Sequence, residues 1–212
     1  MKTEELLQRY ATGERNFRET DLEKASFPHA ILLDICLICA TLKEVDFTLA
    51  NLNSANLMGA DLRYACLTMA RLNYTQLSNA NLYGALLTGA EMKFANLAKA
   101  ELNEAKLIGT DLTGANLTQA SLLNADLRTA NLENAHLQNV NLAEAKLQDA
   151  NLRGADLRGA LLFHANLERA DLRGANLSGA SLNGAILCNA NFDDTQQDGI
   201  NLEGAVQFYI RR

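Results

Sequence analysis

Large apolar residues recur at every fifth position along almost the whole chain. From Leu22 to Phe192 there are 35 such positions, of which 31 hold Leu, and the others are Phe27, Phe47, Met92 and Phe192. Two residues before each of them is a small or modest side chain, usually Ala. A period of five matches neither the 3.6-residue period of an α-helix nor the two-residue alternation of a flat strand. The pattern therefore predicts short extended segments joined by tight turns, with both apolar positions pointing into one core.

The polar positions of each five-residue unit carry turn-forming residues. The residue before the large apolar position is often Asn or Asp, as at Asn51 and Asp61. Gly is concentrated two residues after the large apolar position, where twelve of the thirteen glycines fall. Asn and Asp can hydrogen-bond to neighbouring backbone, and Gly relaxes a turn. The unit reads A-(N/D)-L-x-x, with Gly favoured at the last position.

Typical stretches of this repeat are ANLNSANLMGADLRYA at residues 50–65 and NLRGADLRGA at residues 151–160. They resemble the pentapeptide-repeat family, and the resemblance covers about nine-tenths of the chain. It implies an all-β fold, a right-handed quadrilateral β-helix with four pentapeptides in each coil. Leu and the preceding small residue would face inward, and the other three positions would face solvent.

Three segments are expected on this basis. Residues 1–16 are predicted to form an N-terminal cap, residues 17–205 a β-helix of about nine coils, and residues 206–212 a C-terminal tail. With about 4.8 Å between stacked strands, the rod would be roughly 43 Å long.

The N-terminal cap is predicted to contain a short helix from Thr3 to Thr12. Thr3 is the expected N-cap, Glu4 and Glu5 suit the first turn, and Gly13 is a natural stop. The segment LLQRYATGERNF resembles the capping start of cyanobacterial members of the family. The apolar residues expected on one face of this helix are Leu6, Leu7 and Tyr10.

Both ends of the repeat depart from the pattern. Just after the cap, four outward positions are unusually apolar: Ile31, Leu33, Cys36 and Ile38. They are interpreted either as the docking surface of the cap or as a site for a partner. At the other end Gln197 replaces Leu and Leu202 restores it. Val206, Phe208 and Ile210 offer an apolar end, so the chain is expected to be a monomer or a weak end-to-end dimer.

Charge and hydropathy indicate which partners and which cellular location to expect. The net charge is −6, whereas a protein that grips phosphates needs a basic face, so direct nucleic-acid binding is not expected. Glu4 and Glu5 stand where a signal peptide has its apolar core. The most apolar stretch, residues 30–42, is interrupted by Asp34 and is shorter than the roughly 20 residues that span a bilayer. A cytoplasmic protein without membrane contact is expected.

No constellation for catalysis or cofactor binding is apparent. Cys36 and Cys39 form a C-x-x-C, but no second ligand pair lies at a spacing suitable for zinc, and reduced structural thiols are expected. Of the three scattered histidines, His164 lies one coil after Glu144, which predicts a surface ion pair. The glycines are spread one to a turn, whereas a phosphate cradle needs several together. The expectation is a protein that is not an enzyme and has no cofactor or metal.

Sorting outward residues by side, with residues 20 apart as vertical neighbours, identifies a candidate binding surface. The side that carries Leu62, Leu82 and Leu102 has eight carboxylates and three bases, for a net charge of −5, and the side of Leu52 and Leu112 has a net charge of −3. Aromatic side chains beside charge are typical interface anchors, although they also form ladders that stabilise the rod. The most acidic side is predicted to expose Tyr64, Tyr83, Leu123, Leu161 and Phe163, and Tyr74 and Phe94 are expected to stack on an adjoining side.

Two functions from different classes fit this surface. The first is a non-catalytic scaffold or regulatory module that presents a rigid surface to a protein partner. The second, which the family resemblance suggests, is a DNA mimic that occupies the DNA groove of gyrase or a topoisomerase. Duplex DNA carries one charge for about every 1.7 Å, so a mimic of this length would need roughly 25 charges. The net charge of −6 therefore favours the scaffold.

Overall fold

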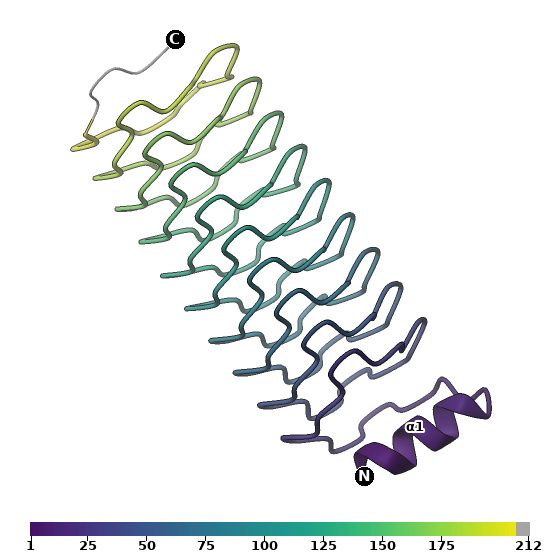
Figure 1. Cartoon of the computed structure of the whole chain (residues 1–212). Helices are drawn as coiled ribbons and strands as arrows, with labels where there is room; N and C mark the ends of the chain where they lie inside the picture. Colours follow the sequence, from purple (N-terminus) through teal and green to yellow (C-terminus); the bar gives the residue numbers. More distant parts are fainter. Residues whose placement is uncertain (207–212) are drawn as a thin grey trace.

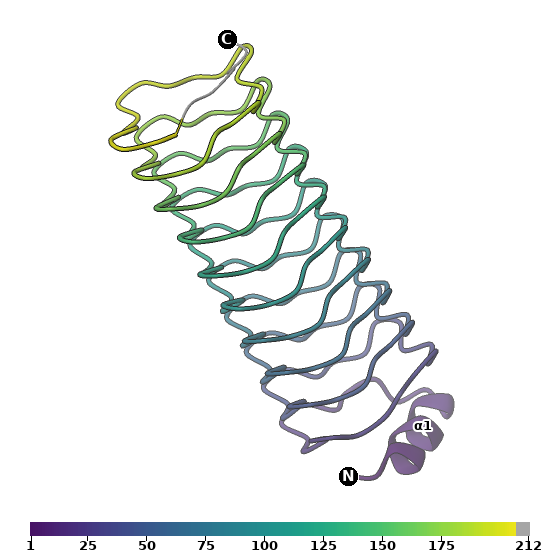
Figure 2. The same ribbon diagram turned by 60° about the vertical axis from the view of Figure 1, so that its left-hand side comes forward.

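The protein is a solenoid of stacked 20-residue coils with a helix at its N-terminal end (Figure 1). In this computed structural model, residues 1–206 are described. Parallel bridges join residues 20 apart, from Asn16 with Cys36 to Ile186 with Val206. Each bridge is isolated, so each side of a coil contributes one bridging residue and no longer strand occurs in the described range. The expectation of short extended segments joined by turns is confirmed, and Figure 2 shows the coils stacking in register along the rod.

The turn after each core residue explains the five-residue period. The carbonyl of Leu62 accepts a hydrogen bond from the N–H of Ala65 at 3.0 Å, which closes a β-turn. Between turns, the N–H of Leu62 donates to Asn81 O at 2.7 Å in the next coil. The N–H of Asp61 donates to Ala40 O at 3.0 Å in the previous coil. Turn and ladder together use the backbone hydrogen-bonding groups that a buried core would otherwise leave unpaired.

The last residue of every pentapeptide from Glu19 to Gly204 has a positive φ, between 53° and 69°. Twenty-six of these residues are not Gly. A left-handed conformation costs a residue with a Cβ roughly 1–2 kcal/mol, so the preference for Gly at this position has a direct energetic cause. The ladder compensates, because this residue also donates a backbone hydrogen bond, as from Tyr64 N–H to Tyr83 O at 2.9 Å.

The core is a column of Leu and Ala. The large apolar residues from Leu22 to Leu187 are almost completely buried, and so are the Ala residues that precede them beyond the first coils. Phe27 and Phe47 stack within this column with ring centroids 5.4 Å apart. Two Thr at the small inward position, Thr75 and Thr110, donate to carbonyls of Leu52 and Leu87 at 3.0 and 2.8 Å, so neither hydroxyl is unpaired.

Helix α1, Thr3–Ala11, covers part of the first coil. Leu6 is buried against the core, and the Tyr10 hydroxyl donates to Leu33 O at 2.9 Å. Thr3 is not the N-cap as predicted, since Lys2 holds that position without a side-chain cap. The Thr3 hydroxyl instead accepts from Ser26 N–H at 3.4 Å, an edge group of the first coil. Gly13, with φ of 99°, follows the C-cap Thr12, which agrees with its predicted role as a stop.

The residues expected to dock the cap do so only in part. Leu33 contributes its carbonyl to Tyr10, but Ile31 is 66% exposed and is not covered by α1. Leu7 is also exposed, so the apolar face of the helix is narrower than Leu6, Leu7 and Tyr10 together. At the other end Val206 is exposed, and Phe208 and Ile210 lie outside the described residues.

Candidate partner-binding surface

Three outward positions in each pentapeptide form the surface of the rod. In most coils the Asn or Asp before the core residue accepts a hydrogen bond from the N–H two residues further on, as from Tyr83 N–H to Asn81 Oδ1 at 3.0 Å. The residue after the core residue and the left-handed corner residue then project from the turn. The term "acidic side" is used below for the outward residues of the pentapeptides centred on Leu22, Leu42, Leu62, Leu82, Leu102, Leu122, Leu142, Leu162, Leu182 and Leu202.

Tyr64 and Tyr83 form an aromatic pair on the acidic side. Their rings meet edge to face with centroids 5.5 Å apart, and Tyr64 is 51% exposed while Tyr83 is half-buried. The Tyr64 ring lies over Gly84, where a Cβ atom would come within 2.8 Å of two ring carbons. Interaction with the Glu104 carboxylate is the main cause that raises the pKa of Tyr83. Gly84 thus creates the space in which Tyr64 lies flat against the next coil.

The other residues predicted for this surface lie further along the same side. Leu161 and Phe163 flank the core residue Leu162 and are 39% and 36% exposed. Leu123 is half-buried and lies between this pair and the two tyrosines along the rod. The structure therefore places all five predicted residues on one side, in two clusters with Leu123 between them.

The charges of the acidic side are distributed unevenly. Its three bases all form ion pairs near the N-terminal end: Lys24 and Lys43 with Glu23 and Glu44 at 3.6–3.8 Å, and Arg63 with Asp61 at 2.6 Å. In contrast, no ion pair within the described residues involves the remaining carboxylates of this side, Asp21, Glu101, Glu104, Glu144 and Glu203. Most of the uncompensated negative charge therefore lies beyond Arg63, beside Tyr83, Leu123 and Phe163.

Tyr74 and Phe94 form a second aromatic pair, stacked with centroids 5.4 Å apart and 15° between ring planes. Phe94 in turn lies over Gly114, where a Cβ would come within 2.6 Å of the ring. The turn that carries Tyr74 is two turns beyond that of Tyr64 in a four-turn coil, so the pairs occupy diagonally opposite corners and not adjoining sides as predicted. A flat partner that covers one pair does not reach the other.

The sequence analysis missed a further group of exposed apolar residues on the side after the acidic one. Leu49, Met69 and Leu86 are 44%, 54% and 43% exposed. Met69 lies over Gly89 as Tyr64 lies over Gly84. The signal that could have found them is a large apolar residue at an outward position of the repeat, the same signal that identified Tyr64 and Tyr74.

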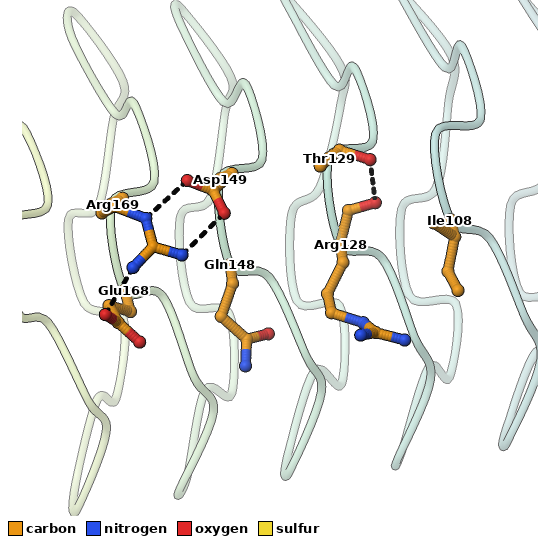
Figure 3. A pocket seen from close by; sticks show the side chains of 7 residues that line it. All are labelled: Ile108, Arg128, Thr129, Gln148, Asp149, Glu168 and Arg169. Atoms are coloured by element: carbon orange, nitrogen blue, oxygen red, sulfur yellow. Dashed lines mark hydrogen bonds and ion pairs between the residues drawn. The ribbon is translucent and has the colours of Figure 1, made fainter.

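A shallow concavity of about 520 Å³ lies on the same side as Met69, lined by residues of four consecutive coils (Figure 3). Arg169 donates to both oxygens of Asp149 at 2.7 and 2.8 Å and to Glu168 at 2.5 Å, and these carboxylates raise its pKa. Arg128 is held by both oxygens of the nearly buried Asp126 at 2.8 and 2.7 Å, which keeps the pKa of Asp126 low. Because each guanidinium is already paired, the described residues that line the concavity offer no free cation for an anionic ligand.

The side chains that could act in catalysis or metal binding do not lie close together in the part of the chain that the structure describes. His164 was predicted to pair with Glu144, but its ring lies over Gly184 in the following coil and no such pair forms. All four cysteines are free thiols, and Cys39 is exposed. Within residues 1–206 no three His, Cys, Asp or Glu side chains are grouped so that they could hold a metal ion. In the same range no helix is long and apolar enough to cross a membrane.

Known proteins match both the sequence and the fold. The family model described as "Pentapeptide repeats" matches in eight copies, over residues 35–73, 65–103, 75–114, 95–134, 125–162 and 165–204. No curated protein sequence matches the chain. The crystal structure of HetL, a pentapeptide repeat protein involved in heterocyst differentiation regulation from the cyanobacterium Nostoc sp. strain PCC 7120, is 34% identical with a TM-score of 0.78. The match covers 97% of this chain and 94% of HetL.

A more distant match shows the fold alone. Trypsin-treated QnrB1, a plasmid-mediated fluoroquinolone resistance protein, has a TM-score of 0.59 at 16% identity, with 92% of this chain and 90% of QnrB1 covered. The family and these structures imply a right-handed winding for the coils described above. The five-residue period, the stacked 20-residue coils and the match over most of its length show that this chain belongs to the pentapeptide-repeat family.

Proposed function

We propose that this protein is a non-catalytic regulatory module that binds a protein partner through its acidic side. The observation that carries the proposal is the exposure of Tyr64, Leu161 and Phe163 on one side of a rod whose inward positions are filled by Leu and Ala. Interface centres are enriched in aromatic side chains that become desolvated on binding. Since the ladder holds every coil, this surface is preorganised, which reduces the entropic cost of binding.

The relation to HetL supports a regulatory role. HetL is described as involved in the regulation of heterocyst differentiation, and it resembles this chain over nearly its full length. By this likeness we assign the present protein to regulation inside a cell, in the cytoplasm.

The ion pairs of the acidic side weigh against duplex mimicry. Glu23, Glu44 and Asp61 are neutralised by neighbouring bases, so the free charge of this side is the five carboxylates left unpaired within the described residues, which make up its net charge of −5. A mimic of B-form DNA needs roughly one charge for every 1.7 Å of rod. A partner that recognises aromatic and aliphatic groups among a few carboxylates fits this surface better than a DNA-binding groove does.

Affinity capture from the source cell's lysate tests the proposal. The wild type is compared with a Tyr64→Ala, Tyr83→Ala, Phe163→Ala variant and with a matched Tyr74→Ala, Phe94→Ala control from the opposite corner. We expect a specific protein to be captured by the wild type and the control and lost by the triple variant. Retention by the triple variant would refute the choice of surface, and capture of gyrase subunits would instead favour duplex mimicry.

A further inference from the structure

Large apolar residues and carboxylates alternate from coil to coil along the acidic side. The order along the rod is Tyr83, Glu104, Leu123, Glu144 and Phe163, with one member in each successive coil. The apolar members occupy the position after the core residue, and the carboxylates occupy the left-handed corner beside it. With about 4.8 Å between coils, like groups recur about every 9.6 Å and the row spans roughly 19 Å.

No base compensates this row. From Asn81 to Glu203 the outward positions of the acidic side contain no Lys or Arg. Lys106 and Lys146 begin the neighbouring side, and neither forms an ion pair with Glu104 or Glu144. Glu104 and Glu144 are both exposed, so each is available to a positively charged group from outside.

The spacing discriminates between shapes of a basic partner. In an α-helix, residues seven apart lie about 10.5 Å apart on one face, and residues three or four apart lie between them. Over the row the accumulated mismatch is about 2 Å, which the long side chains of Lys and Arg absorb. In an extended strand, residues on one face recur about every 6.7 Å, which matches neither the 4.8 Å nor the 9.6 Å spacing of the rod.

We propose that the acidic side binds an amphipathic basic α-helix of the partner protein, aligned with the rod. Apolar residues of that helix, seven apart, contact Tyr83, Leu123 and Phe163. Lys or Arg residues between them pair with Glu104 and Glu144. Tyr64 extends the apolar contact at the Tyr83 end, since its ring lies over Gly84 in the coil of Tyr83. This inference rests on the proposed function, because it specifies the partner of the same surface.

The test uses a synthetic fluorescent peptide and the whole protein. The peptide is an Ala-rich helix of about 16 residues with Leu at every seventh position and Arg three and four residues after each Leu. A control peptide of the same composition places its Leu and Arg on alternate residues, as an extended strand would. We expect the protein to bind the helical peptide at least about five-fold more tightly than the control, as measured by fluorescence anisotropy.

Charge-matched variants locate the site. Glu104→Gln with Glu144→Gln is expected to weaken binding of the helical peptide about ten-fold at low salt, a loss that shrinks as salt is raised. Glu91→Gln with Glu133→Gln removes two carboxylates from the opposite side and is expected to leave binding within about two-fold, since only screened long-range attraction is lost. Gln119 already occupies a left-handed corner, so Gln at positions 104 and 144 is compatible with the fold. Circular dichroism verifies that both variants are folded.

The outcomes separate this inference from the proposed function. Equal affinity for the two peptides, no binding of the helical peptide, or equal losses in the two Gln variants would overturn the basic-helix inference. If a lysate partner depends on Tyr64, Tyr83 and Phe163 but is indifferent to Glu104→Gln with Glu144→Gln, the proposed function stands and the basic-helix inference falls. A partner that the aromatic triple variant retains overturns both.

Discussion

Replacement of Gly84 by Ala tests whether the corner glycines make room for exposed aromatic rings. At φ of +64°, an added Cβ would lie 2.8 Å from Cδ1 and Cε1 of Tyr64. The ring must therefore leave its position, which also disturbs its edge-to-face contact with Tyr83 at 5.5 Å. Gly174 is the matched control, because it has nearly the same φ, +68°, and nothing lies within 4 Å of its added Cβ.

The two substitutions share one cost and differ in another. Both place Ala in the left-handed region, which destabilises the fold by about 1–2 kcal/mol. Only Gly84→Ala also displaces a ring, at about 0.5–1.5 kcal/mol for an unfavourable rotamer and a similar amount for the lost aromatic contact. We expect a loss of about 3 kcal/mol for Gly84→Ala and about 1–2 kcal/mol for Gly174→Ala.

A double-mutant cycle measures the coupling directly. Urea unfolding followed by circular dichroism gives the free energy of unfolding for the wild type, Tyr64→Ala, Gly84→Ala and the double variant. In the Tyr64→Ala background, Gly84→Ala should cost no more than Gly174→Ala does. Equal costs for Gly84→Ala and Gly174→Ala in the wild type, or a cost at Gly84 that persists without the ring, would refute the argument.

Three other changes follow from the same geometry. Lys99→Gly, at φ of +60°, should raise the free energy of unfolding by about 0.5–1 kcal/mol as it relieves left-handed strain, whereas Lys99→Ala should not, and a thermal melt of both distinguishes strain from side-chain loss. Leu112→Ala in the middle of the core column should cost about 3–5 kcal/mol in urea unfolding, and a cost below 1 kcal/mol would contradict a close-packed core. The hydrogen bond from Arg128 holds the pKa of Asp126 below its ordinary value of about 4. This pair therefore contributes its full stabilisation at pH values above about 4, and the contribution is lost as the pH falls through the lowered pKa of Asp126. Asp126→Asn should therefore cost about 1–3 kcal/mol at neutral pH and flatten the acid limb of the stability profile, while the more exposed Asp149→Asn should cost less.

The coil architecture was predictable because the same five-residue pattern of apolar and polar positions recurs along almost the whole chain. Each Leu from Leu22 onward adds the same local information about turn, core and ladder. The cap was less predictable, since it occurs once and its contacts are specific. Thr3 has the residue type of an N-cap, but its hydroxyl accepts from Ser26 in the coil above, a tertiary contact that residue preferences do not encode.

The candidate site was predictable in position but not in its contacts. That Tyr64 and Tyr83 share a side follows from the period of 20. The overlap of Tyr64 with Gly84, and the turn of His164 away from Glu144, depend on the direction in which a left-handed corner points its side chain. The sequence pattern does not specify that direction, because it treats the three outward positions alike.

The corner positions show which part of the rod offers a binding surface. Large side chains at the left-handed corners lie over the corner residue of the next coil, 20 positions later. In four cases that residue is Gly: Tyr64 lies over Gly84, Met69 over Gly89, Phe94 over Gly114 and His164 over Gly184. Toward the C-terminal end the corners instead hold Gly itself with little around it, as at Gly174, Gly179 and Gly199. These last coils present bare backbone at most corners, with no side chain to anchor a partner. The large corner side chains that lie over a Gly are therefore found between Tyr64 and His164, where the alternating row of the acidic side also lies.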